Sequence, residues 1–501
     1  MRRVILCLLV AALVGSLTAC GSDDKKDGTS SVAPGTGKTV RWGTSTLPTT
    51  FDPATVGSAT HIVYFGLIYD TLIHTDTNGV LTPMLATDWK LSSDGMSLDM
   101  TLRDGVKFQD GSTFDAKAAV SNFDYMRSDK SLVANSLAMV KSVEATGPLA
   151  LKFMMSRPGG DLPGLLAGLA GMMSSPASLA AGTNATKPVG AGPFKIGTIS
   201  NAKVTFTYWD GYWNAKDIVP RSVEVSFIAD DAARLNALKS GQLDIAISRA
   251  SQIPEAEAAG LEHFEIPAAT AYAVQLNATQ PGLDNPDVRR AISMAIDREG
   301  INKTLGNGIC SITAQPYNDK YWAHDKTIDE KPYLKHDVAA AKALVAKNAP
   351  DLSLTILAPN ITVYQHLAEV VQGDLSKIGI SAKVNAIDYV DLTTRSLKGD
   401  YQMVVTLTTP GSPDPASWES KYFKLSPVSD VYLDPKIPEY LAESYLSADP
   451  KLRATAIGKA TNAALEAGTN QITICVPPNT WLGAAGLTGF ASNDPRHVLV
   501  K

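Results

Sequence analysis

The sequence has few of the residues on which covalent frameworks and metal sites depend. Its 501 residues include 4 cysteines, too few for a disulfide-rich scaffold, and 7 scattered histidines, which form no metal-binding pattern. One uninterrupted apolar run occurs, near the N-terminus, which excludes a membrane protein with several spans. Lysine plus arginine number 45 against 50 acidic residues, with no basic block, so nucleic-acid binding is not expected. The 45% hydrophobic content excludes a wholly disordered chain, and the length suggests about three domains.

The short motifs of common enzymes are also missing. The sequence contains no His-Glu-x-x-His, no Gly-x-Ser-x-Gly, no phosphate loop and no Cys-x-x-Cys. His366 and Glu369 are a lone pair one helical turn apart, which is more typical of a solvated helix face than of a metal site. We therefore expect no catalytic residue, no metal and no cofactor, and an enzyme is the disfavoured alternative.

The first twenty residues suggest export and lipid attachment. Arg2 and Arg3 precede an apolar segment, residues 4–13, that is too short to span a bilayer stably. Residues 17–20, Leu-Thr-Ala-Cys, resemble the lipobox of bacterial lipoproteins, which implies cleavage after residue 19 and acylation of Cys20. Residues 20–37 are polar and predict a flexible tether, and more than one acyl chain would anchor the protein stably to the outer face of the cell membrane. The alternative is an ordinary secretory signal with an incidental cysteine.

The two remaining cysteines are Cys310 and Cys475. Outside the membrane, where disulfides persist, they could be bridged. Two free buried cysteines are the alternative, and the sequence leaves both open.

The rest of the chain alternates strand-like and helix-like segments, which predicts an α/β fold. Residues 39–43 read as a first strand, and residues 96–102 alternate apolar and polar side chains as a half-buried strand does. Turn residues on both sides of the second strand indicate a hairpin or meander. Residues 115–126 predict a helix with an apolar stripe.

Later segments give clearer helices. Asn285-Pro286 is a favourable N-cap and first-turn pair for a helix reaching residue 296. Residues 363–378 form another apolar stripe, closed by Gly379, and residues 232–239 form a third helix. Residues 162–178 are apolar but contain two prolines, which predicts buried helix and loop and not a membrane span.

Seven ordered segments resemble one family, the extracytoplasmic solute-binding proteins, family 5, of peptide and nickel ABC importers. Each match is weak alone, and their order and spacing carry the resemblance. They specify turns and core positions, so we expect a structural role for them. The segments are residues 51–53 (FDP), 67–72 (LIYDTL), 81–89 (LTPMLATDW), 102–111 (LRDGVKFQDG), 188–194 (PVGAGPF), 241–245 (GQLDI) and 288–298 (VRRAISMAIDR).

This resemblance implies a two-lobed periplasmic-binding-protein-like fold with a hinge (type II, cluster C-like) and an additional inserted domain. It implies a monomer that captures a small-molecule or peptide ligand between domains I and III and serves an ABC permease and ATPase complex. A solute-sensing or cell-surface lipoprotein without transport is the alternative on the same fold. The implied divisions are domain I at residues 38–80, 187–268 and 478–501, domain II at 81–186, and domain III at 269–477.

Peptide-binding members of the family hold the peptide ammonium group with an aspartate four residues before the proline of an acidic-Pro pair. If Asp414-Pro415 is that pair, this position is Gly411, and Thr408 replaces the family's tryptophan. Either Asp414 takes over the role, or the ligand is not a peptide with a free N-terminus, because a buried ammonium without a partner costs several kcal/mol. We favour a ligand that is not a peptide with a free N-terminus. A neutral or hydroxylated solute suits a binding-site wall with Thr408 and Gly411 at these positions best.

Other candidate ligand contacts follow from position in the implied fold. The aromatic candidates could equally belong to the core, and threonines on one strand alternate between its faces. The further candidates are Thr46, Leu47, Tyr272, Gln275, Tyr364, Thr406, Thr409, Trp418 and Trp481.

Overall fold

The computed structural model describes residues 37–56, 62–76, 78–218, 220–266, 270–408 and 414–487. The signal peptide, Cys20 and nearly all of the predicted tether lie outside these ranges, and so do Thr409 and Gly411. Within the described ranges, no helix has both the length and the apolar character needed to cross a membrane.

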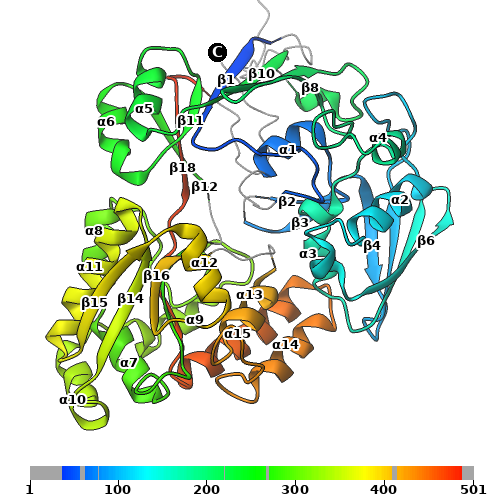
Figure 1. Ribbon diagram of the computed structural model, residues 1–501. Coiled ribbons are helices and arrows are strands. Elements are labelled where there is room, and N and C mark those ends of the chain that lie inside the picture. The colour runs from blue at the N-terminus through cyan, green and yellow to red at the C-terminus, as the bar shows by residue number, and fades with distance from the viewer. Residues whose placement is uncertain are drawn as a thin grey trace, which may run out of the picture. The chain divides into compact units, whose positions relative to one another are not determined.

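The largest sheet joins strands from the beginning, the middle and the end of the chain. Strand β1 (Thr39–Thr44) lies between β10 (Ser222–Phe227) and β11 (Ile245–Ile247) and runs parallel to both. Figure 1 shows the blue β1 beside the green β10, and the red β18 (Asn479–Gly483) beside β11 and β12 (Glu262–Ile266). The strand order is β12, β18, β11, β1, β10, β9 (Lys203–Tyr208) and β8 (Phe194–Ile199).

The predicted first strand is confirmed as β1, and an ion pair fixes it to its neighbour. The carboxylate of Asp244 accepts hydrogen bonds from the backbone N–H, Nε and Nη2 of Arg41. Asp244 is buried and belongs to the segment 241–245 that resembles the family. This family-like segment therefore has a structural role, because its Asp244 holds β11 beside β1.

A separate antiparallel sheet contains the predicted strand at residues 96–102. From Leu98 to Leu102 the buried and exposed positions alternate as expected, with Leu98, Met100 and Leu102 buried and Asp99 exposed, whereas Ser97, predicted on the exposed face, is buried. The predicted hairpin is also present, because β4 and β5 pair on either side of the turn. The strand order is β4 (Ala86–Leu91), β5 (Ser97–Leu102), β7 (Ala150–Met155) and β6 (Val140–Gly147).

Helix α2 (Ala116–Met126) packs against this sheet and confirms the predicted helix. Asp115 is its N-cap and accepts a hydrogen bond from the backbone N–H of Ala118 at 2.8 Å. Phe123 is buried and meets Phe153 of β7 edge to face, with ring centroids 5.0 Å apart. The apolar segment at 162–178 is buried helix and loop as predicted, in α3 (Leu162–Leu165), η3 (Leu169–Gly171) and the start of α4 (Pro176–Ala181).

The third large sheet lies in the second half of the chain. Strand β14 (Ser353–Pro359) runs parallel to β15 (Ser381–Ile387) and β16 (Met403–Thr408), whereas β13 (Ala271–Leu276) is antiparallel to β16 and β17 (Gln471–Cys475). The strand order is β15, β14, β16, β13 and β17.

The two clearest predicted helices belong with this sheet. Helix α7 (Pro286–Ala295) begins after the N-cap Asn285, and α11 (Thr362–Lys377) is followed by Gly379, whose φ of 91° suits a glycine. Their apolar stripes share one buried core with β13, β14 and β16. Both predictions are confirmed to within two residues.

The remaining elements complete the layers around these sheets. A two-stranded sheet joins β2 (Ile73–Thr75) and β3 (Leu81–Pro83), and the predicted helix at 232–239 is α5 (Asp231–Lys239). The other helices are α1 (Ile62–Ile68), η2 (Ala134–Leu137), η4 (Ala215–Asp217), η5 (Ala250–Gln252), α6 (Ile253–Ala258), α8 (Arg298–Leu305), α9 (Lys326–Asp329), η6 (Pro332–Leu334), α10 (Val338–Asn348), α12 (Tyr389–Leu397), α13 (Pro415–Tyr422), α14 (Ile437–Tyr445) and α15 (Pro450–Glu466).

One buried glutamine ties three family-like segments together. The side-chain amide of Gln109 donates to the carbonyl oxygens of Ile68, Gly192 and Phe194, and its oxygen accepts from the N–H of Gly190. Gly190 and Gly192 must lack side chains, because an added Cβ would lie 2.2 and 2.7 Å from the Ile68 oxygen. These segments therefore have the structural role that we predicted.

The segment 288–298 contributes two buried arginines. Arg289 donates to the carbonyls of Ala467 and Gly468 at the end of α15, and Arg298 donates to the carbonyl of Thr473 on β17. Burial lowers the pKa of both guanidinium groups to about 10. Both arginines thus hold the last part of the chain against α7 and α8.

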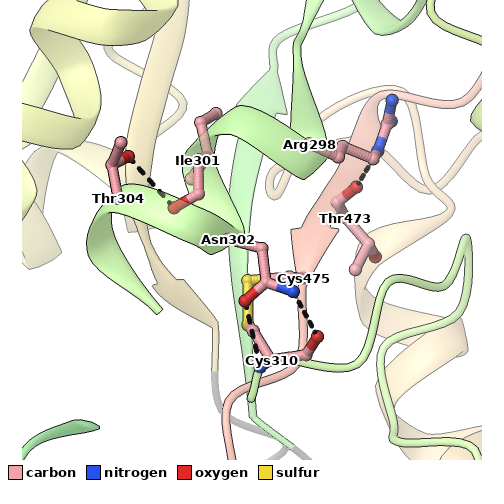
Figure 2. Close-up of a disulfide and its surroundings, with 7 residues drawn as sticks. All are labelled: Arg298, Ile301, Asn302, Thr304, Cys310, Thr473 and Cys475. Atoms are coloured by element: carbon pink, nitrogen blue, oxygen red, sulfur yellow. Dashed lines mark hydrogen bonds between the residues drawn. A yellow bond between two sulfur atoms is a disulfide. The ribbon is translucent and has the colours of Figure 1, made fainter. Parts of the chain in front are cut away.

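Cys310 and Cys475 form a disulfide, which closes a loop of 165 residues (Figure 2). The side-chain amide of Asn302 clamps the backbone of Cys310, donating to its carbonyl oxygen at 2.9 Å and accepting from its N–H at 3.1 Å. Figure 2 also shows Arg298 bound to the Thr473 carbonyl, two residues before Cys475. The disulfide therefore fixes the end of β17.

Candidate functional site

In open sheets with parallel strands, ligands bind outside the carboxyl ends of those strands. In the seven-stranded sheet these ends are Thr44 of β1, Phe227 of β10 and Ile247 of β11. In the five-stranded sheet they are Pro359 of β14, Ile387 of β15 and Thr408 of β16. The candidate site consists of side chains that follow or adjoin these ends.

The loop after β1 is held in place by hydroxyl groups. Thr44 Oγ1 donates to the carbonyl oxygen of Thr46 at 2.9 Å, and Tyr64 OH donates to the same oxygen at 3.1 Å and to Thr44 Oγ1. Thr46 is exposed and Leu47 packs partly against the core. The two predicted contacts from this loop thus stand at the expected edge, in a fixed conformation.

Arg249 extends from the carboxyl end of β11. Asp231, at the start of α5, accepts hydrogen bonds from Nε of Arg249 and from Nη2 of Arg234. Burial alone would lower the pKa of Arg249. The hydrogen bond to Asp231 and the charge of that carboxylate outweigh the effect of burial, so the pKa of Arg249 is raised. Arg249 is therefore a cation with a fixed stem, and its side chain remains half exposed.

Two tyrosines meet at the matching edge of the five-stranded sheet. Tyr272 lies on β13 opposite Leu407 of β16, and Tyr364 lies in the first turn of α11, just after β14. Their rings meet edge to face with centroids 6.2 Å apart. Burial raises the pKa of both hydroxyl groups, so both remain protonated at neutral pH.

Electrostatics connects the two edges. The positive charge of Arg249 lowers the pKa of Tyr272 and of Tyr364, against the larger effect of burial. Tyr389, at the start of α12, also acts on Tyr364 and is itself exposed. The candidate site thus combines a cation that follows one sheet with aromatic hydroxyl groups at the edge of the other, and groups of these kinds suit a polar solute with an apolar body.

Several predicted contacts are buried within the protein. Trp418 packs against Tyr422 and Phe423 in a core cluster, and Trp481 packs against Trp42. The expectation that these two tryptophans stack on a ligand is therefore not supported, and the core alternative fits. Thr406 and Thr408 are also buried, and the hydroxyl group of Thr408 donates to the carbonyl oxygen of Ala271. Gln275 is partly exposed and lies in the middle of β13.

The carboxylate of Asp414 is bound by other residues of the protein. Its Oδ2 lies 2.6 Å from Nη1 of Arg453, and its Oδ1 accepts from Arg453 Nη2 and from the N–H of Ala416. To receive a peptide ammonium group, Asp414 would have to leave these partners, because its carboxylate is buried and already has a counter-charge. Gly411 and Thr409 lie outside the described residues.

Arg249 and Asp231 were not among the residues predicted from the sequence. A usable signal was present in the sequence, since Arg249 comes shortly after the strand that begins in the family-like segment 241–245.

Among the described residues no group of three or more His, Cys, Asp or Glu side chains is placed to hold a metal ion. Three of the described histidines lie beside a carboxylate instead: His263 beside Glu257, His324 beside Asp329 and His336 beside Asp297.

Comparison with known proteins decides the family. The sequence model of the bacterial extracellular solute-binding proteins, family 5 (middle region), matches residues 80–428. The chain belongs to this family. The prediction made from the seven segments is confirmed, and the members of this family are solute-binding proteins and not enzymes.

Relatives of this family 5 protein are named for different solutes. The probable di/tripeptide-binding protein 5 of Pseudomonas aeruginosa (strain UCBPP-PA14) is 26% identical over 416 residues, which cover 75% of this chain and 78% of the relative. The solved structure of DppA from Helicobacter pylori with the peptide STSA has a TM-score of 0.77 at 22% identity, covering 92% and 98% of the two chains. That of AgaA from A. tumefaciens R10 with agropinic acid has a TM-score of 0.76 at 24% identity, covering 92% and 99%. The two-lobed fold is thereby confirmed.

Proposed function

We propose that this family 5 protein is the receptor of an ABC importer, which captures one solute between two lobes outside the membrane and delivers it to the permease and ATPase. The seven-stranded sheet then belongs to domain I, the four-stranded sheet to domain II and the five-stranded sheet to domain III, with the boundaries predicted from the sequence. We further propose that the protein acts as a monomer.

The observation that carries this proposal is the relation of Arg249 to Tyr272 and Tyr364. These residues follow or adjoin the carboxyl ends of parallel strands in two different sheets. A solute bound there would contact both lobes. Its binding would favour the closed arrangement by its differential affinity for that state.

Two short connections between the sheets support a hinge. Strand β12 ends at Ile266 and β13 begins at Ala271, and β17 ends at Cys475 before β18 begins at Asn479. Ser311 and Val476 exchange backbone hydrogen bonds beside the second connection. Together with the disulfide, this pairing fixes one end of the connection, so that rotation would be confined to the few residues before β18.

The anchor and the ligand complete the proposal. We propose that Cys20 carries the lipid and holds the protein at the outer face of the cell membrane. We also propose that the solute is not a peptide recognised by its free N-terminus. The commitment of Asp414 to Arg453 supports this view, and one relative on the same fold binds agropinic acid.

A thermal-shift screen tests the function. The panel contains peptides, sugars, organic acids, small aromatic compounds and metal chelates. A solute at 100 times its Kd should raise the free energy of unfolding by about 2.7 kcal/mol. The proposal is supported if one chemical class raises the melting temperature in a saturable manner, and it fails if no solute of any class does.

A further inference from the structure

We propose that direct contacts between the two predicted lobes form a latch that holds the protein closed. The main contact joins residues 157–160, which follow β7 in domain II, to residues 445–447 at the end of α14 in domain III. The turn at residues 78–79 of domain I makes a second contact with domain III. This inference rests on the proposed function, because it assumes two lobes that open and close around a solute.

Backbone hydrogen bonds cross between the lobes at both places. The N–H of Gly160 donates to the carbonyl oxygen of Tyr445 at 2.8 Å, and the N–H of Trp322 donates to that of Asn78 at 3.1 Å. Gly160 and Asn78 belong to the first predicted lobe, which contains domains I and II, whereas Tyr445 and Trp322 belong to the second. Both bonds therefore join the lobes at places that the connecting strands do not link.

The absence of a side chain at Gly160 allows this close approach. A Cβ added there would lie 2.1 Å from the backbone oxygen of Ser447 and 2.8 Å from that of Tyr445. The three nearest atoms all belong to these two residues of the opposite lobe. A side chain at this position would thus obstruct the contact between the lobes and leave the packing of its own lobe undisturbed. At the second contact, a Cβ on Gly79 would lie 2.5 Å from a ring carbon of Tyr321.

A stacked pair of side chains adds to the main contact. The guanidinium group of Arg157 lies over the ring of Tyr445, with Cζ 4.2 Å from the ring centroid. Its direction is fixed by Asp161, whose two carboxylate oxygens accept from Nη1 and Nη2 of Arg157. A cation over an aromatic face is attracted to it, and the attraction is stronger away from water. The stack therefore favours the closed arrangement.

One buried arginine organises the surface that receives both contacts. Nε of Arg453 donates to the carbonyl oxygen of Ser444, next to Tyr445, and the guanidinium group lies over the ring of Trp322 at 5.4 Å. Its charge is balanced by Asp414 within the same lobe. The two receiving points are thus held in a fixed relation, so we expect both contacts to form and break together.

The contacts have the character of an interface that can separate. They consist of backbone hydrogen bonds and a cation on a ring, and such groups can exchange their partners for water when the lobes open. Interfaces between domains of one chain permit relative motion unless they are large and apolar. The apparent affinity for a solute is reduced by the fraction of protein that is not competent to bind it. The latch would therefore tune solute affinity through residues that do not touch the solute.

Amide hydrogen exchange of the full-length protein without solute tests the latch. Gly160→Ala places a Cβ against Ser447, and alanine suits the backbone at this position because its φ is not positive. The amide of Trp322 reports on the second contact. It should exchange at least ~10-fold faster in the variant, because opening of the lobes releases both bonds. The amide of Gly159, which donates to the carbonyl of Gly95 within domain II, should keep its wild-type rate.

Two further variants make the test specific. Gly164→Ala is the matched control at the same interface, because its new Cβ would lie 3.6 Å from Oδ2 of Asp414, an ordinary contact distance. Exchange at Trp322 should not change in this control. Tyr445→Leu removes the ring beneath Arg157 and keeps the backbone acceptor, so it should speed exchange at Trp322 several-fold even if Gly160→Ala does not fold.

A binding measurement connects the latch to affinity. The panel compound that gives the largest thermal shift with the wild type should bind ~10-fold more weakly to Gly160→Ala, because less of the variant is closed. The same compound should bind Gly164→Ala as tightly as the wild type. Equal affinities of all three proteins would contradict a role of the latch in binding.

The outcomes separate the latch from the receptor function. Unchanged exchange at Trp322 in both Gly160→Ala and Tyr445→Leu would show that the latch is wrong. An equal rise in exchange for the strands β1 and β14 would also contradict it, because the variants would then loosen the whole fold. Neither result bears on the receptor function, which the thermal-shift screen tests. If no panel compound binds, the receptor function fails, and exchange at Trp322 still decides whether the lobes are latched.

Discussion

Asp414 and Arg453 form an ion pair that is almost completely shielded from water. Asp414 Oδ2 lies 2.6 Å from Arg453 Nη1, and the two side chains are 1% and 4% exposed. Arg453 also donates from Nε to the carbonyl of Ser444, while Asp414 caps the N-terminus of α13. The pair thus joins α13, the end of α14 and α15, and it engages the carboxylate that the sequence offered as a partner for a peptide ammonium group.

Breaking this pair should destabilise the protein strongly. Arg453→Met leaves a buried carboxylate without a counter-charge, and we expect a loss of about 3–5 kcal/mol in the free energy of unfolding, measured with urea. Lys203→Met, in the exposed pair with Glu224, is the matched control and should cost no more than about 1 kcal/mol. Equal losses in the two variants would show that burial does not set the strength of the Asp414–Arg453 pair.

Glu419 should make stability depend on pH. It is fully buried, Oε1 accepts from Thr461 Oγ1 at 2.5 Å, and Oε2 has no hydrogen-bond partner among the described residues. Burial raises its pKa well above the usual value, and the nearby charge of Asp414 adds to the rise. Because the folded state holds this proton more tightly than the unfolded state, the stabilisation is complete below the unfolded pKa and is lost as pH rises toward the folded pKa.

Glu419→Gln keeps the shape and removes the titration. As pH rises above about 4.5, we expect the wild type to lose up to about 1.4 kcal/mol per pH unit relative to the variant. Urea unfolding of both proteins between pH 4 and pH 8 measures the difference. A difference that stays constant over this range would mean that Glu419 does not hold its proton in the folded state.

The disulfide should contribute to the stability of the lobe that contains β17. Cys310→Ala with Cys475→Ala should lower the free energy of unfolding by about 2–5 kcal/mol. Peptide mapping of the oxidised wild-type protein should yield one linked fragment containing both cysteines. Recovery of Cys310 and Cys475 in separate fragments without prior reduction would contradict the bridge.

The anchor depends on the thiol of Cys20. Cys20→Ala should leave the protein unprocessed or release it, since acylation requires that sulfur. Fractionation of cells followed by intact mass measurement distinguishes the lipidated, unprocessed and released forms. A Cys20→Ala protein of mature size that still partitions fully with the membranes would show that the lipobox interpretation is wrong.

Local signals in the sequence predicted much of the fold. The strict alternation before Leu102 located β5, and the Asn285-Pro286 pair located the start of α7, because these patterns are set by neighbouring residues. The sequence could not show that β1 pairs with β10, some 180 residues later, or that Gln109 reaches three separate backbone segments. Such long-range contacts leave no local periodicity.

The site was harder to predict, for a physical reason. Trp418 and Trp481 were candidates because aromatic rings can stack on ligands, but the same rings fill cores, and burial decides between the two. Arg249 was overlooked because an arginine on a loop is usually a solvated charge. Its significance depends on the position of Asp231 and of two tyrosines that are distant in the sequence.

The central claim is that this family 5 protein binds one solute reversibly and leaves it unchanged. Isothermal titration calorimetry with the solute that gives the largest thermal shift, followed by mass analysis of the recovered solute, measures both parts of the claim. The account predicts saturable binding of one solute per chain and recovery of the compound with its original mass. Absence of saturable binding for every solute tested, or recovery of a chemically altered compound, would contradict it.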